Sequence, residues 1–479
     1  MAPRTTSLSS LDQVMPRQYI RVALGFETDH HGEAIAALQN GLNNTCNQLP
    51  YLKGNVFESE NSRRQLNIVT ADDDASPRIR DQPAPEYMPS YRSLTDNNAP
   101  AQYFSSNMFP FSTNLDHSGR GEPILGANCF RLDGGLILTV ALHHNVGDGS
   151  GLGILLRLWA ENMSVNHHIH IPSGMADPSK RQMLLIAATQ KEYDNSSLRS
   201  MGDLLGCHPE YRLTLPGKLK AVSPTSTPPS GGCHLLRIPK AKLDLIKASL
   251  INHIPMPSLT INNILTAFLW TCITRIRTSR AVGAITASSS KMGFAVDGRR
   301  VLGFSDWKPG YLGNVNLFGL AELPVAELQI STAIADDQGV LEIALNLQPA
   351  ISAIAAATSR ITASSIVEVL SLVEQSPIVS DIIPGWDAFF GPDLSVTSWA
   401  NMGVYDLDFG AFLGKPDFLR VPAAKIDGLV IILPRRRREQ LGENLSDVRD
   451  EEVIEVMVYL REDDLEHLVK SEALGTLLK

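Results

Sequence analysis

The sequence predicts an α/β protein made of two halves, each of which mixes strands and helices. Residues 19–26 are rich enough in β-branched side chains for a strand, and apolar residues at helical spacing follow over 33–46. Residues 216–233 are rich in proline, glycine and serine and cannot bury enough apolar surface to order themselves. A strand at 234–238 then starts the pattern again. With 479 residues, 43% of them hydrophobic, the chain is long enough for two or three compact units.

The first half contains a turn from a strand into a helix, which we call the elbow. Residues 72–100 are rich in Asp, Pro, Ser and Asn, which indicates a long surface connection before it. Residues 136–142 form an apolar, β-rich run after the turn signal Asp133-Gly134-Gly135, so we expect a buried strand fed by a hairpin. Apolar residues at helical spacing come soon after, and either Asp148 or Ser150 would cap the helix that they predict.

The second half adds further helices and strands. We expect helices over 243–250 and 260–275, helices with one buried face within 330–373, and strands at 428–433 and 455–460. Between those two strands lie four consecutive arginines, 435–438, which we interpret as a solvated loop in preference to a phosphate- or membrane-binding site.

The composition argues against several classes of function. The 42 basic and 51 acidic residues give a net charge of −9, which leaves no broad positive surface for nucleic acid. The N-terminus carries charges and prolines where a secretory signal needs an apolar stretch, and no run approaches the ~20 apolar residues of a membrane span. We therefore expect a soluble cytoplasmic protein that binds neither nucleic acid nor membrane.

The cysteines favour the same compartment. The five cysteines are widely spread and form no Cys-x-x-Cys pair, which fits a reducing environment. Cys207-His208 and Cys233-His234 are conceivable zinc ligands, but each lies in a loop without a second pair at ligand spacing. We expect no metal site.

The elbow carries the residues with the clearest chemistry, His143-His144-Asn145-Val146-Gly147-Asp148-Gly149. A base that removes a proton from a hydroxyl must titrate near neutral pH, as histidine does, which makes His144 the candidate general base. Gly147 and Gly149 leave room for a tight turn and for close approach of a substrate. Asp148 can hold a cation or a backbone amide.

Other segments accompany this motif in a definite order along the chain. They are Leu11-Asp12-Gln13, Met15-Pro16-Arg17, Ala267-Phe268-Leu269-Trp270, Val296-Asp297-Gly298-Arg299, Gly310-Tyr311-Leu312-Gly313-Asn314, Thr397-Ser398-Trp399, Asp408-Phe409-Gly410 and Gly414-Lys415-Pro416. With these residues the sequence resembles the BAHD acyltransferases over nearly its whole length. It is most similar to their fungal branch, typified by trichothecene 3-O-acetyltransferase.

The resemblance implies a chloramphenicol acetyltransferase-like fold with two similar domains, each a mixed β-sheet with flanking helices, and an active-site channel at their interface. The N-terminal domain would cover residues 1–215, the crossover linker 216–233 and the C-terminal domain 234–479. Acyl-CoA, as co-substrate, and a hydroxylated acceptor would meet His144 in the channel. Neither a metal nor a permanently bound cofactor would take part, and a monomer is expected.

The resemblance also implies supporting roles. Asp148 would point away from the channel and pair with Arg299, which shapes the elbow. Asp408 would be structural, although its loop departs from the family pattern, since this chain has Phe412 where the fungal form usually has glycine.

The reaction expected from the resemblance is direct transfer. His144 would deprotonate an acceptor hydroxyl, the alkoxide would attack the thioester, and Thr397 or the Trp399 indole would stabilise the oxyanion or contact the acceptor. No Gly-x-Ser-x-Gly nucleophile elbow occurs, which disfavours a covalent acyl-enzyme. The expected product is an acetylated fungal secondary metabolite, such as a terpenoid or meroterpenoid, and an amine acceptor stays open.

Two alternatives remain. A condensation domain of a peptide synthetase shares the histidine motif and joins carrier-bound acyl groups, but the chain has no carrier or adenylation region. A non-catalytic paralogue would bind a small molecule in the same channel, against which the intact His144, Asp148 and Gly149 weigh.

Overall fold

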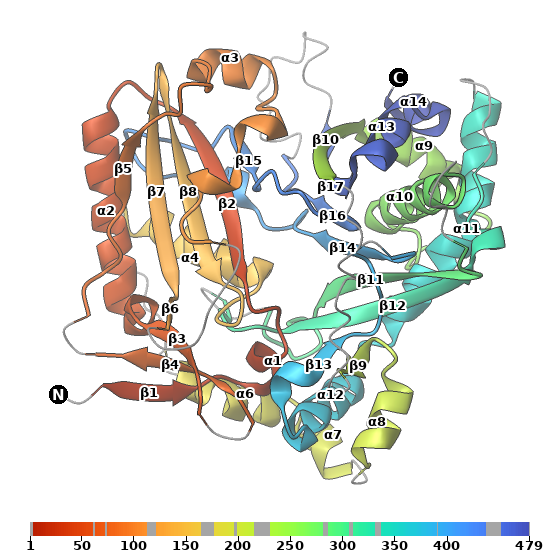
Figure 1. Cartoon of the computed structure of the whole chain (residues 1–479), viewed down its shortest axis with the longest axis horizontal. Coiled ribbons are helices and arrows are strands. Elements are labelled where there is room, and N and C mark those ends of the chain that lie inside the picture. Colours follow the sequence, from red (N-terminus) through yellow and green to blue (C-terminus); the bar gives the residue numbers. More distant parts are fainter. Residues whose placement is uncertain are drawn as a thin grey trace.

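The computed structural model contains two large mixed β-sheets with helices packed around them (Figure 1). It describes residues 3–478 except 61–62, 72–73, 113–120, 164–176, 196–198, 215–229, 281–285, 306–309, 331–336, 390 and 437–451. Two smaller sheets, of four and two strands, lie beside the large ones.

The first large sheet has five strands in the order β15-β2-β8-β7-β5. These are β15 (Phe418–Arg420), β2 (Tyr19–Glu27), β8 (Gly135–His143), β7 (Leu125–Leu132) and β5 (Arg80–Pro83). Only β5 and β7 pair in parallel, so the sheet is mixed. Every residue of β8 is buried, because the strand is covered on both faces, and this accounts for its continuous apolar sequence.

Helices α2 (His31–Gln48) and α4 (Gly149–Glu161) pack against one another on one side of this sheet, with α2 on the outside (Figure 1). Their contact is specific as well as apolar, since the buried Trp159 indole donates to the Leu38 carbonyl at 2.9 Å. The other face of the sheet is covered by an aromatic cluster that includes Phe104, Phe130 and Phe418 together with α3 (Tyr91–Asp96).

The second large sheet has six strands in the order β10-β17-β16-β14-β11-β12. These are β10 (Gly231–Pro239), β17 (Val453–Arg461), β16 (Leu429–Ile432), β14 (Leu394–Ser398), β11 (Ser289–Asp297) and β12 (Asn316–Pro324). Strands β11, β14 and β16 pair in parallel. The pairs β11–β12, β16–β17 and β17–β10 are antiparallel. Around it lie α9 (Lys240–Leu250), α10 (Ile261–Thr278), α11 (Asp337–Ser359), α13 (Glu462–Lys470) and α14 (Glu472–Leu478).

The remaining elements are short and lie mostly below the two sheets in Figure 1. The four-stranded sheet contains β1 (Arg4–Ser7), β4 (Leu66–Thr70), β3 (Asn55–Glu58) and β6 (Glu122–Pro123), and the two-stranded sheet pairs β13 (Ile382–Pro384) with β9 (Tyr211–Leu213). The helices are α1 (Ser10–Gln13), α6 (Arg181–Ala188), α7 (Gln190–Asn195), α8 (Met201–Cys207) and α12 (Ala363–Gln375). Short 3-10 helices occupy Pro50–Lys53, Ala101–Tyr103, Ser106–Met108, Pro178–Lys180, Val325–Glu327, Val379–Asp381 and Val404–Asp406.

Three features differ from the sequence-based expectation. Residues 72–100 are not one irregular connection, because β5 and α3 form within them. Strand β10 begins at Gly231, inside the expected linker, of which 216–229 lie outside the described residues. Strand β15, from the second half of the chain, pairs with β2 and completes the first sheet.

Helix α11 is the one candidate among the described residues that bears on the expectation of no membrane span. Residues Val340–Ser359 are long and apolar enough to do so by length and composition. A core helix of a globular protein meets the same criterion, and here Ile343, Leu347 and Ile351 are fully buried within the second half. One such helix is therefore weak evidence for a membrane span.

Candidate active site

The elbow joins the end of β8 at His143 to the start of α4 at Gly149. Asp148 caps the helix, because its Oδ1 accepts a hydrogen bond of 2.8 Å from the amide of Gly151. Ser150, the other expected cap, instead donates its hydroxyl to Asp297 at 2.7 Å. The strand thus ends at His143, a turn follows, and the cap at Asp148 starts the helix at Gly149.

His144 is the partly exposed histidine of the elbow, whereas His143 is fully buried. The backbone of His144 is held on both sides, since its amide donates to the Gln18 carbonyl at 2.8 Å and its carbonyl accepts from Asn314 Nδ2 at 2.9 Å. The side chain is partly exposed, whereas Nδ1 is buried and finds no hydrogen-bond partner among the described residues. Nε2 is therefore the nitrogen left for a substrate.

Burial lowers the pKa of His144 below the ordinary value for histidine. Its own carbonyl, Asp148 and the Asn314 side chain favour the charged ring but do not outweigh burial. The neutral imidazole is thus the stable form at neutral pH, which is the form that accepts a proton.

Asp148 and Arg299 form a buried, two-bonded ion pair. Arg299 Nη2 donates to Oδ1 at 2.9 Å and Nη1 donates to Oδ2 at 3.1 Å, and Oδ2 also accepts from the Val315 amide at 3.0 Å. Burial alone would lower the pKa of Arg299, but Asp148 and Asp297 outweigh it and raise the pKa. Both carboxylate oxygens of Asp148 therefore accept hydrogen bonds from Arg299 and from backbone amides.

The same arginine connects the elbow to the segment 310–314. Arg299 Nε donates to the Tyr311 carbonyl at 3.0 Å and Nη2 donates to the Gly313 carbonyl at 2.7 Å. A Cβ at Gly147 would stand 3.0 Å from the Leu312 carbonyl oxygen, so a side chain there would crowd this approach.

Trp399 reaches the elbow from the second sheet. It follows β14, where its amide donates to the Ile432 carbonyl at 2.8 Å, and its half-buried indole lies against Gly149. Thr397 is half-buried within β14, opposite Ile431 of β16. Among the residues that the structure describes, no hydrogen bond joins Thr397 to the elbow.

Asp408 lies apart from this arrangement. Its side chain is exposed, and its Oδ1 accepts from the Gly410 amide at 2.9 Å within its own turn. The following Phe409 is buried and packs edge-on against Phe26 of β2, with ring centroids 5.1 Å apart. Phe412, the departure from the fungal pattern, is exposed near His30. The loop therefore anchors the first sheet and makes no described hydrogen bond to the elbow.

Three buried polar residues around the elbow had no role assigned from the sequence. They are Asp12, Arg181 and Asn314, which are linked to one another and to the elbow by hydrogen bonds. Asp12 and Asn314 lie within segments that the family resemblance had already identified. Asp12 is a charged residue between the apolar Leu11 and Met15, and such a residue, when buried, needs a charged partner. No local sequence pattern identifies Arg181 as a residue of the site.

The histidine–cysteine pairs do not form a metal site. His208 lies between Glu210 and Glu368, with ring nitrogens 2.7 and 3.0 Å from their carboxylates, and Cys207 is exposed. Within the described ranges, no group of three or more His, Cys, Asp or Glu residues is placed to hold a metal ion. All five cysteines are free thiols.

Comparison with known proteins finds a family model that matches each half of the chain. Residues 18–162 match the Trichothecene 3-O-acetyltransferase-like N-terminal domain, and residues 242–473 match the Transferase family. Trichothecene 8-O-acetyltransferase of Fusarium sporotrichioides is 28% identical over 99% of this chain and 98% of its own length. Eremophilane O-acetyltransferase ORF8 of Penicillium roqueforti is 26% identical over 89% of this chain and 91% of its own.

Solved structures share the fold. F. graminearum TRI101, complexed with coenzyme A and deoxynivalenol, superimposes with a TM-score of 0.75 over 99% of both chains at 17% sequence identity. At that identity the likeness concerns the fold, and it confirms the expected α/β architecture with a mixed sheet in each half.

Proposed function

Since the chain belongs to the BAHD acyltransferase superfamily, in its fungal branch, we propose that it transfers an acetyl group from acetyl-CoA to a hydroxyl of a fungal secondary metabolite. The relatives found by sequence include fungal O-acetyltransferases whose names specify trichothecene and eremophilane acceptors. A hydroxylated terpenoid or meroterpenoid is therefore the acceptor class proposed here.

The observation that carries the chemistry is the ring of His144, whose pKa is lowered by burial and whose Nδ1 is buried, so that Nε2 is the nitrogen we assign to the acceptor. Nε2 takes the proton from the acceptor hydroxyl while the oxygen attacks the thioester carbonyl. The tetrahedral intermediate then collapses, the C–S bond breaks, and the imidazolium returns the proton to the departing thiolate. The products are an ester and free coenzyme A, with no covalent enzyme intermediate.

The other site residues divide into two groups. The indole N–H of Trp399, placed beside the elbow, is the proposed donor to the oxyanion, with Thr397 as the second candidate. Asp148 and Arg299 are proposed to support the structure of the elbow, since they bond to one another, and Asp408 to support its own turn, where its Oδ1 accepts from the Gly410 amide.

The organisation of the chain follows as a further part of the proposal. The N-terminal domain would span 1–215 and the C-terminal domain 234–479, with 216–233 as the crossover between them. We propose a cytoplasmic location, which the five free thiols support, and a monomeric state.

The test is to incubate the purified protein with acetyl-CoA and a panel of hydroxylated terpenoids and polyketides, and to follow the release of free thiol. Release with at least one alcohol, and its loss in His144→Ala, is the expected result. Turnover that survives His144→Ala would remove the base assignment. Reaction with carrier-bound acyl groups only would favour the condensation-domain alternative, and no turnover with binding of the acceptor would favour a non-catalytic paralogue.

A further inference from the structure

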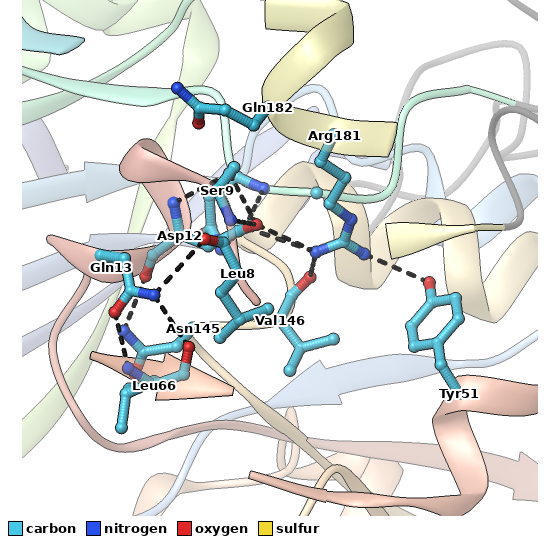
Figure 2. Close-up of polar contacts among 12 residues, drawn as sticks. Leu8, Ser9, Asp12, Gln13, Tyr51, Leu66, Asn145, Val146, Arg181 and Gln182 are labelled. Carbon is cyan, nitrogen blue, oxygen red and sulfur yellow. Dashed lines mark hydrogen bonds and ion pairs between the residues drawn. The ribbon is translucent and has the colours of Figure 1, made fainter. Parts of the chain in front are cut away.

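The first short helix, α1, buries a carboxylate directly beneath the elbow. Asp12 is fully buried, and Figure 2 shows its side chain among polar groups from three separate parts of the chain. Its oxygens accept from the Ser9 hydroxyl at 2.7 Å, from the Asn314 amide and Nδ2 at 2.9 and 2.8 Å, and from Arg181 Nη1 at 3.3 Å. A carboxylate without solvent needs such a set of donors.

Arg181, from α6, is the charged partner of Asp12 and is itself buried. Its Nη1 also donates to the Val146 carbonyl of the elbow at 2.8 Å, and its Nη2 donates to the Tyr51 hydroxyl at 3.3 Å (Figure 2). Its guanidinium carbon lies 5.4 Å from the centre of the Tyr51 ring. The arginine therefore holds the elbow backbone and the carboxylate at the same time.

Three consecutive residues of the elbow are tied to α1 in this way. The His144 carbonyl is held by Asn314, whose amide is in turn held by Asp12. Asn145 Nδ2 donates directly to the Asp12 carbonyl at 2.7 Å, and the Val146 carbonyl is held through Arg181. The ties at Asn145 and Val146 are buried and the tie at His144 is partly buried, and together they hold the path of the backbone that carries the His144 ring.

We propose that Asp12 and Arg181 are a positioning pair that sets the ring of the general base by fixing the strand end of the elbow. The inference rests on the proposed role of His144. The Asp148–Arg299 pair fixes the opposite, helical end, so the elbow is held between two buried ion pairs. Neither Asp12 nor Arg181 needs to touch a substrate.

The primary variant is Asp12→Asn, which keeps an acceptor oxygen for Asn314 and removes the charge opposite Arg181. A displaced base costs rate, so kcat should fall by about 10- to 100-fold. The KM for acetyl-CoA should stay within about twofold of the wild-type value, because the substitution removes no contact that binds substrate and transition state equally. The kcat values are compared at equal concentrations of folded protein, determined by circular dichroism, so that a loss of rate is distinguished from unfolding.

A second readout does not depend on turnover. The imidazole signal of His144 is identified in the histidine NMR spectrum by its absence in His144→Ala, and is then titrated in the wild type and in Asp12→Asn. Because burial is the largest influence on the pKa of His144, a loosened elbow that admits water should raise that pKa toward the ordinary value. A purely structural role for Asp12 would leave the titration of the folded fraction unmoved.

Asp427→Asn is the matched control. Asp427 and Arg277 form an equally buried pair, 2.8 Å apart, in the second half of the chain. The variant should lose stability as Asp12→Asn does, with kcat and the titration of His144 unchanged. An equal loss of kcat in this control would attribute the effect to general destabilisation and overturn the positioning role.

The double variant Asp12→Asn with Arg181→Met guards against a single variant that fails to fold. Removing both charges relieves the uncompensated arginine, so the melting temperature should recover relative to Asp12→Asn. Because Arg181→Met removes the donor to the Val146 carbonyl, the elbow stays loosened and kcat should stay low. Recovery of kcat together with stability would overturn the inference.

The outcomes also separate this inference from the proposed function. If His144→Ala retains thiol release, the base assignment fails, whatever the Asp12 variants do. If His144→Ala is inactive but folded Asp12→Asn keeps the wild-type kcat and titration, the positioning pair alone fails.

Discussion

The indole of Trp399 and the α-carbon of Gly149 are in close contact: a Cβ at Gly149 would stand 2.7 Å from the indole Nε1. This contact joins the second sheet to the first helical residue of the elbow. It also fixes where the indole N–H lies relative to the motif.

Gly149→Ala should displace the indole, because real Cβ atoms are not found that close to another heavy atom. We expect kcat to fall, with intrinsic tryptophan fluorescence reporting the displacement. Gly32→Ala is the control, because that α2 position has open space around it and should leave kcat unchanged. An unchanged kcat in Gly149→Ala would show that the position of the indole is immaterial.

Trp399→Phe tests the oxyanion donor, since it keeps a ring against Gly149 and removes the N–H. Loss of one such donor costs on the order of 10²-fold in kcat. Thr397→Val, which removes the other candidate hydroxyl, should have a much smaller effect. Steady-state kinetics on both variants decides between the two residues, and the reverse ranking would transfer the role to Thr397.

Arg299→Met should destabilise the protein by about 3–5 kcal/mol, because it leaves the Asp148 carboxylate buried and unpaired. The measurement is chemical denaturation followed by circular dichroism. Arg92→Ala is the comparison, since Arg92 pairs with Asp96 at 3.9 Å on the exposed surface of α3, where such pairs contribute about 0–1 kcal/mol. Equal effects in the two variants would mean that the buried pair is not a determinant of stability.

The pH dependence follows from the lowered pKa of His144. The acid limb of the kcat/KM profile should lie below the ordinary histidine pKa of about 6.5, so that activity persists in mildly acidic buffer. The folded state binds the His144 proton less readily than the unfolded chain does. This residue therefore makes stability fall as pH drops from about 6.5 through its folded pKa. An acid limb at or above the ordinary value would contradict the buried, neutral ring.

His208 should behave in the opposite way. Burial acts to lower its pKa, but Glu210 and Glu368 outweigh burial and raise it. Its contribution to stability is present below the unfolded pKa of about 6.5 and is lost as pH rises through the folded pKa. His208→Gln should therefore lower the melting temperature more at pH 5 than at pH 9. A loss that does not depend on pH would exclude an ion pair with the two glutamates.

The local pattern of the sequence was sufficient for much of the elbow. Apolar residues at strand and helical spacing predicted β8 and α4, because those elements follow directly from neighbouring residues. The cap had two candidates, Asp148 and Ser150, and only the hydrogen bond to Gly151 distinguishes them. The contact between Asp148 and Arg299 came from the family resemblance, since no local pattern connects residues so far apart in the sequence.

The parts that the sequence could not provide depend on long-range contacts. Strand β15 has three residues, too few for a periodic signal, and its partner β2 lies near the other end of the chain. Arg181 stands at the start of α6, where a buried arginine and an exposed one have the same local sequence. Its carboxylate partner, Asp12, becomes visible only once α1 and α6 are brought together.

Strand β15 also has a consequence for how the two halves can be separated or exchanged. Because Phe418–Arg420 pairs with Ala23–Gly25, a fragment containing only the first half would expose the edge of β2 as an open template for aggregation. A swap of halves between homologues would have to match the hydrogen-bonding edge and the Phe418 ring that fills the space above Gly25. A recombination point between residues 215 and 230 would therefore need a compensating exchange of the β15 segment.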